Sequence, residues 1–212
     1  TLSSSTLFKR MKFRFLTLSA LFLCLNTFAQ KVSQNANYQF FVDLTKVQND
    51  KLEVSLITPK ISKDEVIYNI PKIVPGTYAN YDFGRYVSDF KAFDSNGKTL
   101  SVDKLDKNSY KIKGAKTLNK ITYLVDDTWD SPEITGEYVF EPAGTNIDEN
   151  KLFAINSHGF FGYFTEMKRQ AYEVTFTKPE GFYGASSLTA SKSDAKNDTF
   201  IVPNYNDLVD AP

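Results

Sequence analysis

Alternation of apolar and polar residues constrains the fold of this chain more than any other feature. In the segment 38–45, the side chains of Tyr38, Phe40, Val42 and Leu44 fall on one face of an extended backbone. This period-2 pattern, in runs rich in β-branched and aromatic residues, predicts half-buried β-strands. Outside the N-terminal region, no window of about twelve or more residues carries a helical stripe. The same alternation predicts further strands at 51–58, 109–113, 120–125 and 171–176.

Turn signals separate the predicted strands. The pair Asn96-Gly97 lies between the segments 87–94 and 98–104. Asn-Gly is the strongest short hairpin signal, because both central residues of a type I′ turn need a positive φ. These two segments are therefore expected to form a hairpin.

A second turn is predicted at Pro75-Gly76. Proline fixes φ at the first central position of a type II turn, and glycine accepts the positive φ at the second. The region 127–149, by contrast, is the least regular part of the chain and is expected to be a long excursion. Together these patterns predict an all-β domain of roughly nine to eleven strands, either an antiparallel β-sandwich or a broad curved sheet.

The N-terminal segment 11–29 has the three-part layout of a secretory signal peptide. It starts with the basic residues Lys12 and Arg14, continues with an apolar run over 15–25, and ends with small residues up to Ala29. The run is too short to span a bilayer, which takes roughly 20 apolar residues. The pattern therefore predicts export, to the periplasm or the cell exterior.

Cleavage is expected after Ala29, which leaves a mature domain of residues 30–212. Residues 1–10 are interpreted as upstream translation or a mis-set start. Residues 1–29 contain four basic and no acidic residues, so the mature chain keeps 21 basic and 25 acidic residues. This charge is ordinary for a soluble domain and does not indicate a nucleic-acid partner, and no membrane span is expected after cleavage. The only cysteine, Cys24, leaves with the signal.

The residues of the predicted domain do not form a recognisable catalytic motif. His158 is the only histidine, whereas a catalytic zinc normally has three protein ligands, of which one or two at least are histidines. No H-E-x-x-H, G-x-S-x-G or glycine-rich phosphate loop is present. We therefore predict no catalytic residue, no metal site and no cofactor in this chain. A hydrolase that uses paired carboxylates remains an alternative, because sequence alone cannot place two carboxylates across a cleft.

Another short motif, Asn197-Asp198-Thr199, matches a glycosylation acceptor. Because the motif is short and common, we interpret it as a polar turn.

Six segments of the chain form an ordered set of motifs. They are "IPKIVPGTYANYDFGRYV" (70–87), "FDSNGKTL" (93–100), "DTWD" (127–130), "FEPAGTN" (140–146), "AINSHGFFGYF" (154–164) and "NYNDLVDAP" (204–212). In this order they resemble the N-terminal domain of the glycyl aminopeptidase family of zinc metallopeptidases. The resemblance runs from about Tyr38 to Pro212, almost the whole mature chain. Two positions depart from the family pattern: Ile73 stands where a tryptophan is usual, and Tyr81 where an arginine is usual.

The resemblance implies that the chemistry lies in a part of the protein missing from this chain. Full chains of that family have a thermolysin-like catalytic domain, which holds the zinc and a glutamate, and a PDZ domain. Their activity is removal of N-terminal glycine or alanine from peptides, in which zinc activates a water and the glutamate is the general base. The resemblance thus implies a non-catalytic N-terminal domain of a secreted zinc metalloaminopeptidase. Its partners would be the missing catalytic domain, on which it packs and whose cleft it borders, and the peptide substrate of the parent enzyme.

The segment 154–164 is the first candidate for a functional role. Polar groups lie beside aromatic ones here, as in the wall of a pocket, and the resemblance suggests a cleft edge or domain interface. An aromatic core strand that ends in a glycine turn has the same composition, and the two interpretations are left open. The candidates are Asn156, His158, Phe160, Phe161 and Tyr163.

The matched motif in 70–87 is interpreted as a rigid structural corner, in preference to a loop that borders the cleft. The corner would combine a type II turn, buried tyrosines and an Asp82–Arg85 ion pair. Its residues are Pro75, Gly76, Tyr78, Asp82 and Arg85.

Near the end of the sequence, Asp207 and Asp210 resemble the junction into the missing catalytic domain, which they would cap or order. Part of the aromatic surface is expected to meet that domain, so the isolated chain is expected to self-associate. The alternative function is a stand-alone secreted β-sandwich module that binds carbohydrate or acts as an adhesin. In that case Trp129 and Tyr138 would stack against the ligand on one sheet face.

Overall fold

The computed structural model describes residues 36–131 and 138–211. The predicted signal peptide and its cleavage site lie outside the described residues. Within these residues the fold is all-β, as predicted, with thirteen strands and only short helical segments. No described helix has the length and apolar character needed to cross a membrane.

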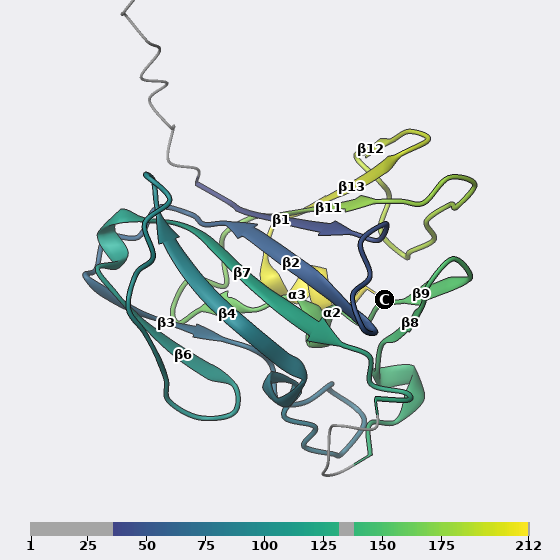
Figure 1. Ribbon diagram of the computed structural model, residues 1–212, viewed down its shortest axis with the longest axis horizontal. Coiled ribbons are helices and arrows are strands. Elements are labelled where there is room, and N and C mark those ends of the chain that lie inside the picture. The colour runs from purple at the N-terminus through teal and green to yellow at the C-terminus, as the bar shows by residue number, and fades with distance from the viewer. Residues whose placement is uncertain (1–35, 132–137, 212) are drawn as a thin grey trace, which may run out of the picture. The chain divides into compact units, whose positions relative to one another are not determined.

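The larger sheet has seven strands in the order β12-β13-β11-β1-β2-β7-β4 (Figure 1). Each alternating segment that the sequence predicted for this sheet forms a strand within two residues of its expected start. The strands are β1 (Tyr38–Asp43), β2 (Lys51–Ile57), β4 (Val87–Asp94), β7 (Leu118–Asp126), β11 (Tyr172–Thr177), β12 (Lys192–Ser193) and β13 (Asn197–Val202).

A smaller sheet, in the order β10-β3-β6-β5, packs against the larger one in a sandwich-like arrangement, and β8 pairs only with β9. Three 3-10 turns and two α-helices connect the strands. These elements are β3 (Glu65–Asn69), β5 (Val102–Lys104), β6 (Ser109–Lys113), β8 (Asn146–Asp148), β9 (Leu152–Ala154), β10 (Tyr163–Phe164), η1 (Phe83–Tyr86), η2 (Ala115–Thr117), η3 (Glu141–Ala143), α2 (Ser157–Phe160) and α3 (Tyr205–Val209).

The core lies between the sheets and is rich in aromatic side chains. Tyr38, Phe40 and Val42 are buried on the inner face of β1, whereas Phe41 between them points outward. The alternation that predicted this strand therefore corresponds to its two faces. The ring of Tyr38 stacks on that of Tyr172 in β11, with centroids 4.2 Å apart.

The strand pairing differs from the prediction at one point. β1 pairs with β2 in antiparallel orientation but with β11 in parallel orientation, so the sheet is mixed. A two-residue hairpin joins only antiparallel strands, and parallel neighbours need a long connection. The chain between β1 and β11, which contains most of the domain, is that connection.

Both predicted turns occur, but one has a different conformation. At Pro75-Gly76 the Thr77 amide donates to the Val74 carbonyl oxygen over 3.3 Å, and Gly76 has a φ of +90°, as a type II turn requires. At Asn96-Gly97 only the glycine has a positive φ. The predicted type I′ turn is therefore wrong there.

The conformation at Asn96-Gly97 follows from the preceding Asp94. Its Oδ1 accepts hydrogen bonds from the backbone amides of Asn96, over 2.8 Å, and Lys98, over 2.9 Å. An aspartate that binds the amides ahead of it stabilises a longer loop, in which a single glycine takes the positive φ. The chain still reverses there, because Phe93 bridges to Thr99. The expected hairpin of 87–94 with 98–104 is wrong beyond this bridge, since β4 pairs with β7 in the larger sheet and β5 pairs with β6 in the smaller one.

The excursion predicted at 127–149 contains short regular elements, η3 and β8, and its residues 132–137 lie outside the described ones. Asp127 organises it, because its carboxylate accepts hydrogen bonds from the amides of Trp129 and Ile147. Burial raises the pKa of Asp127, and these amide hydrogen bonds act in the opposite direction. The interpretation of 197–199 as a polar turn is wrong, since these residues begin β13.

Candidate functional site

Helix α2 places the only histidine inside the domain. The Asn156 side chain caps this single turn, because its Oδ1 accepts a hydrogen bond of 3.0 Å from the His158 amide. His158 is only 6% exposed, and its Nδ1 has no hydrogen-bond partner among the described residues. A buried polar atom without a partner is uncommon in folded proteins and needs an explanation.

The surroundings of His158 favour its neutral form. Burial lowers the pKa of the imidazole below its ordinary value of 6.5, because the charged form loses hydration. The carboxylate of Asp210 opposes this effect, and the ammonium of Lys168 adds to it. At neutral pH the ring therefore offers an uncharged nitrogen rather than a cation.

His158 lines a cavity of about 490 Å3, which we call the His158 cavity. The cavity lies between the loop after β3, the start of β10 and helix α3. Because Ile73, Lys168 and Asp210 are exposed, it opens on the surface. Its lining consists of Asn69, Ile70, Pro71, Lys72, Ile73, Pro75, Asn108, Ser109, His158, Tyr163, Lys168, Tyr205, Asn206, Val209 and Asp210.

Two tyrosines hold the ammonium group of Lys168 at this cavity. Lys168 Nζ lies 3.9 Å from the ring centroid of Tyr163 and 5.2 Å from that of Tyr205. Both distances are within the range of cation–π attraction. The Tyr205 amide donates to the Lys168 carbonyl oxygen over 2.9 Å, which fixes the backbone as well. No described acidic residue forms an ion pair with Lys168.

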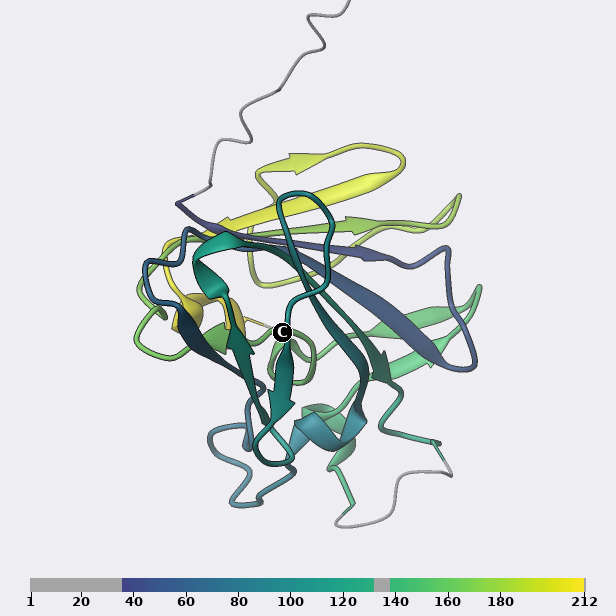
Figure 2. The same ribbon diagram turned by 60° about the vertical axis from the view of Figure 1, so that its left-hand side comes forward.

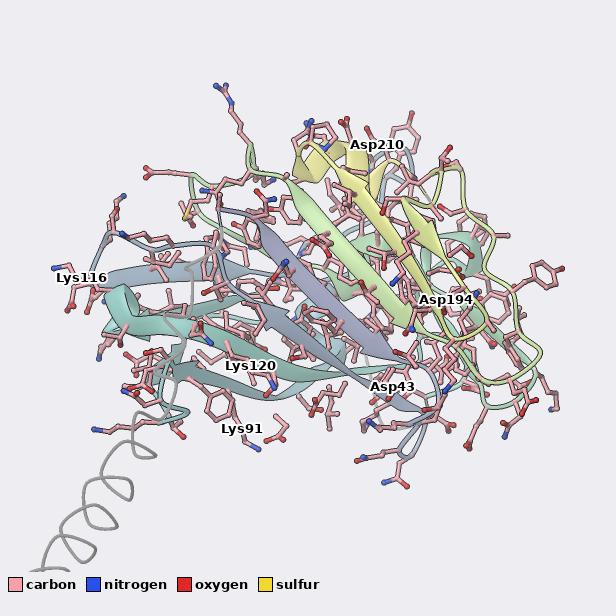
Figure 3. All side chains as sticks on the ribbon, turned by 90° about the horizontal axis from the view of Figure 1, so that it is seen from above. Asp43, Lys91, Lys116, Lys120, Asp194 and Asp210 are labelled. Atoms are coloured by element: carbon pink, nitrogen blue, oxygen red, sulfur yellow. The ribbon has the colours of Figure 1, made fainter. Side chains whose placement is uncertain are left out.

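The second charged group comes from the end of α3. The Asn204 Oδ1 caps this helix by accepting from the Asp207 amide over 3.1 Å, and the Asn204 Nδ2 donates to Asp207 Oδ2 over 2.9 Å. Asn204 is therefore the cap and Asp207 lies in the first turn of the helix, while its expected role at a junction with a catalytic domain stays a prediction. Asp210 ends the helix, where its amide donates to the Asn206 carbonyl oxygen, and its side chain lines the His158 cavity (Figure 3).

For the segment 154–164 the sequence left open whether it is a pocket wall or an aromatic core strand, and each interpretation describes some of its residues. His158 and Tyr163 line the cavity, and Asn156 orders the backbone of α2. Phe160 and Phe161 are fully buried core residues, as in the aromatic-core interpretation.

The segment 70–87 forms a corner, but the expected contacts within it are partly wrong. Tyr78 is fully exposed, whereas Tyr81 is buried. The predicted ion pair of Asp82 with Arg85 is absent from the described contacts. Instead, Asp82 Oδ1 accepts a hydrogen bond of 2.8 Å from Asn108 Nδ2, and Asp82 Oδ2 lies 3.4 Å from Lys107 Nζ. The fold brings Lys107 and Asn108 to this corner. Their contacts with Asp82 join segments that are distant in the sequence, so a local motif does not reveal them.

Arg85 has a different role in the corner. Its Nε donates a hydrogen bond of 2.8 Å to the Tyr81 carbonyl oxygen, and its guanidinium carbon lies 4.8 Å from the Tyr86 ring centroid. The side chain therefore fastens the backbone just before η1. Pro75 and Ile73, from the same segment, reach the wall of the His158 cavity.

The aromatic residues proposed for ligand stacking do not lie on a sheet face. Trp129 and Tyr138 belong to the excursion, where Trp129 Nε1 donates to the Glu141 carbonyl oxygen and the Tyr138 hydroxyl donates to Glu141 Oε1. This arrangement does not favour the carbohydrate-binding alternative.

A second cavity, of about 570 Å3, is mainly apolar. It lies beside β11 and β13 and includes Phe161, Phe176 and Phe200 in its lining. A buried ion pair borders it, in which Lys178 Nζ lies 2.8 Å from Asp198 Oδ2.

The described residues do not provide a metal site. No group of three or more histidine, cysteine, aspartate or glutamate side chains in 36–131 and 138–211 is arranged to hold an ion. The charged groups of the His158 cavity include an ammonium, which disfavours a cation there. The geometry supports binding of a small polar molecule in this cavity.

Comparison with known proteins identifies the family. The sequence model of the Peptidase M61 N-terminal domain matches residues 39–212. The chain belongs to the Peptidase M61 N-terminal domain family. No curated protein sequence matches the chain significantly.

The fold of this M61 N-terminal domain recurs in a solved structure. An aminopeptidase N family protein from Idiomarina loihiensis superposes with a TM-score of 0.64 at 19% identity, over 82% of this chain and 28% of that one. An M1 zinc metallopeptidase from Deinococcus radiodurans gives a TM-score of 0.41 at 13% identity, over 80% of this chain and 39% of that one. The chain thus spans less than half the length of either protein.

Lys168 and Tyr205 are among the residues of the His158 cavity that were not predicted from the sequence. Lys168 lies in a connection without periodicity, and Tyr205 stands in a segment interpreted only as a junction. The one available signal was the "NYNDL" helix start, where Asn204 and Asp207 have the spacing of a cap. It predicts the helix but not the cavity behind it.

Proposed function

We propose that this M61 N-terminal domain is the non-catalytic N-terminal part of a secreted zinc metalloaminopeptidase similar to the glycyl aminopeptidases. It packs on the catalytic domain and borders the cleft in which N-terminal glycine or alanine is removed. The zinc and its general base belong to that catalytic domain. The observation that carries this proposal is the family match over 39–212, in a chain whose described residues offer no metal-ligand cluster.

The distribution of exposed apolar side chains supports a docking role. Five of the large exposed hydrophobic residues lie on two loops, one at 70–82 and one whose described parts are 127–131 and 138–143. Figures 1 and 2 place both loops at the same end of the domain, next to η1. Apolar residues gathered on one surface are typical of an interaction site. The five residues are Ile73, Tyr78, Trp129, Tyr138 and Phe140.

The first experiment is to sequence the gene beyond the codon for Pro212. The proposal expects an open frame that encodes H-E-x-x-H. A stop codon directly after Pro212 in the natural gene would contradict it and would favour a stand-alone binding module.

The second experiment tests the docking surface in the longer protein. Ile73→Asp combined with Tyr78→Asp is expected to lower kcat/KM for an alanyl or glycyl amide about tenfold, because a charge at an apolar interface is left desolvated. The matched control is Ile201→Asp, an exposed isoleucine on β13 away from both loops. Equal activity of the double variant and the control would exclude these loops as the interface. Export is tested separately, by N-terminal sequencing of the secreted protein for a start at Gln30.

A further inference from the structure

The His158 cavity is lined by three charged groups, the ammoniums of Lys72 and Lys168 and the carboxylate of Asp210. Lys168 and Asp210 each act on the pKa of His158 from nearby. None of the three belongs to any ion pair in the described part of the chain. The cavity therefore presents two ammoniums, a carboxylate and a buried imidazole without a partner for Nδ1.

Other polar groups of the cavity already have partners. Asn108 Nδ2 donates to Asp82, and the hydroxyl of Ser109 donates to Asn69 Oδ1 over 3.2 Å. Hydrogen-bonding capacity remains at His158, Lys168 and Asp210, and also at the other lining side chains for which no hydrogen-bond partner is found in the described residues, Lys72, Tyr163 and Asn206. A buried group without a partner costs stability unless water or a ligand satisfies it.

We propose that the His158 cavity binds a free α-amino acid with an apolar side chain. The ligand's carboxylate pairs with the Lys168 ammonium, its own ammonium pairs with the Asp210 carboxylate, and the neutral imidazole of His158 adds a hydrogen bond. The apolar side chain lies against Ile73 and Val209, which face the same space.

Charge complementarity selects this ligand class. A simple carboxylate would pair with the ammoniums of Lys168 and Lys72 but would leave Asp210 unpaired, and a simple amine would pair with Asp210 but would be repelled by both ammoniums. A zwitterion satisfies Lys168 and Asp210 at once, and charged pairs of this kind are the stronger hydrogen bonds. A volume of about 490 Å3 is also in the usual range for small-molecule sites. All residues of the site belong to this chain, so binding is measured without a catalytic domain; Ile73 is the cavity residue that also lies on the proposed docking surface.

The test is calorimetric titration of the full chain at pH 7.5 with L-leucine and two half-ligands. 4-Methylpentanoate is leucine without its amine, and 3-methylbutylamine is leucine without its carboxylate. Leucine is expected to bind at least about tenfold more tightly than either half-ligand, because one charged hydrogen bond contributes about that factor. If a half-ligand binds as tightly as leucine, or if leucine shows no saturable binding, the proposal is wrong.

Variants assign the binding to the cavity. Lys168→Gln and Asp210→Asn are each expected to raise the Kd for leucine about tenfold or more. The controls are Lys120→Gln and Glu53→Gln on β7 and β2 of the large sheet, which should leave the Kd unchanged; Figure 3 shows Lys120 over that sheet. Lys168→Arg keeps the cation and should retain more affinity than Lys168→Gln. Unchanged affinity in both cavity variants, with thermal unfolding like that of the wild type, would overturn the assignment.

Discussion

The Tyr68 hydroxyl lies 3.1 Å from the Tyr123 hydroxyl, and both side chains are buried between the two sheets. Burial raises the pKa of each phenol, so both are protonated at neutral pH. The Tyr123 hydroxyl donates a hydrogen bond of 2.6 Å to the Phe160 carbonyl oxygen. Because its single proton is engaged there, the hydroxyl of Tyr68 must be the donor to that of Tyr123. Tyr68 in turn accepts from the Gly162 amide over 3.1 Å. The result is a directed chain of hydrogen bonds that holds the end of α2 against both sheets.

Removal of the middle hydroxyl should be costly. Tyr123→Phe leaves the Phe160 carbonyl oxygen and the Tyr68 hydroxyl buried without this partner, which is expected to lower the free energy of unfolding by about 1–3 kcal/mol. Urea unfolding measures the change. Tyr172→Phe is the control: its buried hydroxyl has no partner among the described residues, so its loss should change stability by less than about 0.5 kcal/mol. Equal losses in the two variants would contradict the directed chain.

Gly84 in η1 is expected to tolerate no side chain. A Cβ there would lie 2.0 Å from the Lys107 carbonyl oxygen and 2.7 Å from the Asn108 Cα, both backbone atoms. Gly84→Ala should therefore destabilise the domain by about 3 kcal/mol, near the upper end for overpacking. Gly97→Ala, which meets no atom within 4 Å but has a φ of +78°, should cost only about 1 kcal/mol. Thermal unfolding of the two variants measures these losses of stability. If Gly84→Ala loses less stability than Gly97→Ala, the backbone of the corner can shift to make room for the methyl group.

The buried Lys178–Asp198 pair should be sensitive to loss of one partner. Asp198 also accepts from the Ser193 hydroxyl over 2.6 Å. Burial acts to raise the pKa of Asp198, but the hydrogen bonds from Lys178 and Ser193 outweigh it and the pKa is lowered. Lys178→Met leaves this carboxylate buried without its cation and is expected to destabilise the domain by about 3 kcal/mol.

The compensating variant tests the cause. Lys178→Met combined with Asp198→Asn removes both charges and should lose clearly less stability than Lys178→Met alone. A double variant that is no more stable than the single one would show that packing of the lysine stem, rather than the unpaired charge, is responsible.

His158 should make stability fall with acidification. Its pKa is lowered in the folded state, so below the ordinary value of 6.5 the unfolded chain binds a proton that the folded chain does not. The stabilisation is complete above about pH 7 and decreases as the pH falls from there toward the folded pKa. Thermal unfolding between pH 7.5 and pH 5.5 should show a smaller decrease for His158→Gln than for the wild type. An equal decrease of stability in the wild type and in His158→Gln would mean that other titratable groups cause the pH dependence.

The strands were largely predictable because alternation records which side chain is buried at each position. The runs around Tyr38, Leu52 and Tyr123 each alternate with period 2, and each forms a strand of the large sheet. The three-residue strands β8 and β9 are too short to show a period, and no other pattern predicts them. The parallel pairing of β1 with β11 depends on the route of the intervening chain, which no local pattern describes.

The candidate site was only partly predictable for a related reason. His158 was named because polar and aromatic residues lie side by side in 154–164, and Asp210 because its segment resembles the junction into a catalytic domain. Lys168 resembles any solvated lysine until the fold stacks it on Tyr163 and Tyr205. Asp198 resembled part of a polar turn until Lys178 was found beside it. Such pairings join distant segments, and composition does not specify them.

The parallel partner of β1 has a consequence during synthesis. Gln39 and Glu173, on neighbouring strands, are 134 residues apart in the chain. At ribosomal speeds the first strand therefore waits on the order of ten seconds for its neighbour to be translated. Throughout that interval one edge of Tyr38–Asp43 has no backbone partner and is open to pairing with another nascent chain. A chaperone that recognises extended aromatic segments has its longest opportunity to act at this edge.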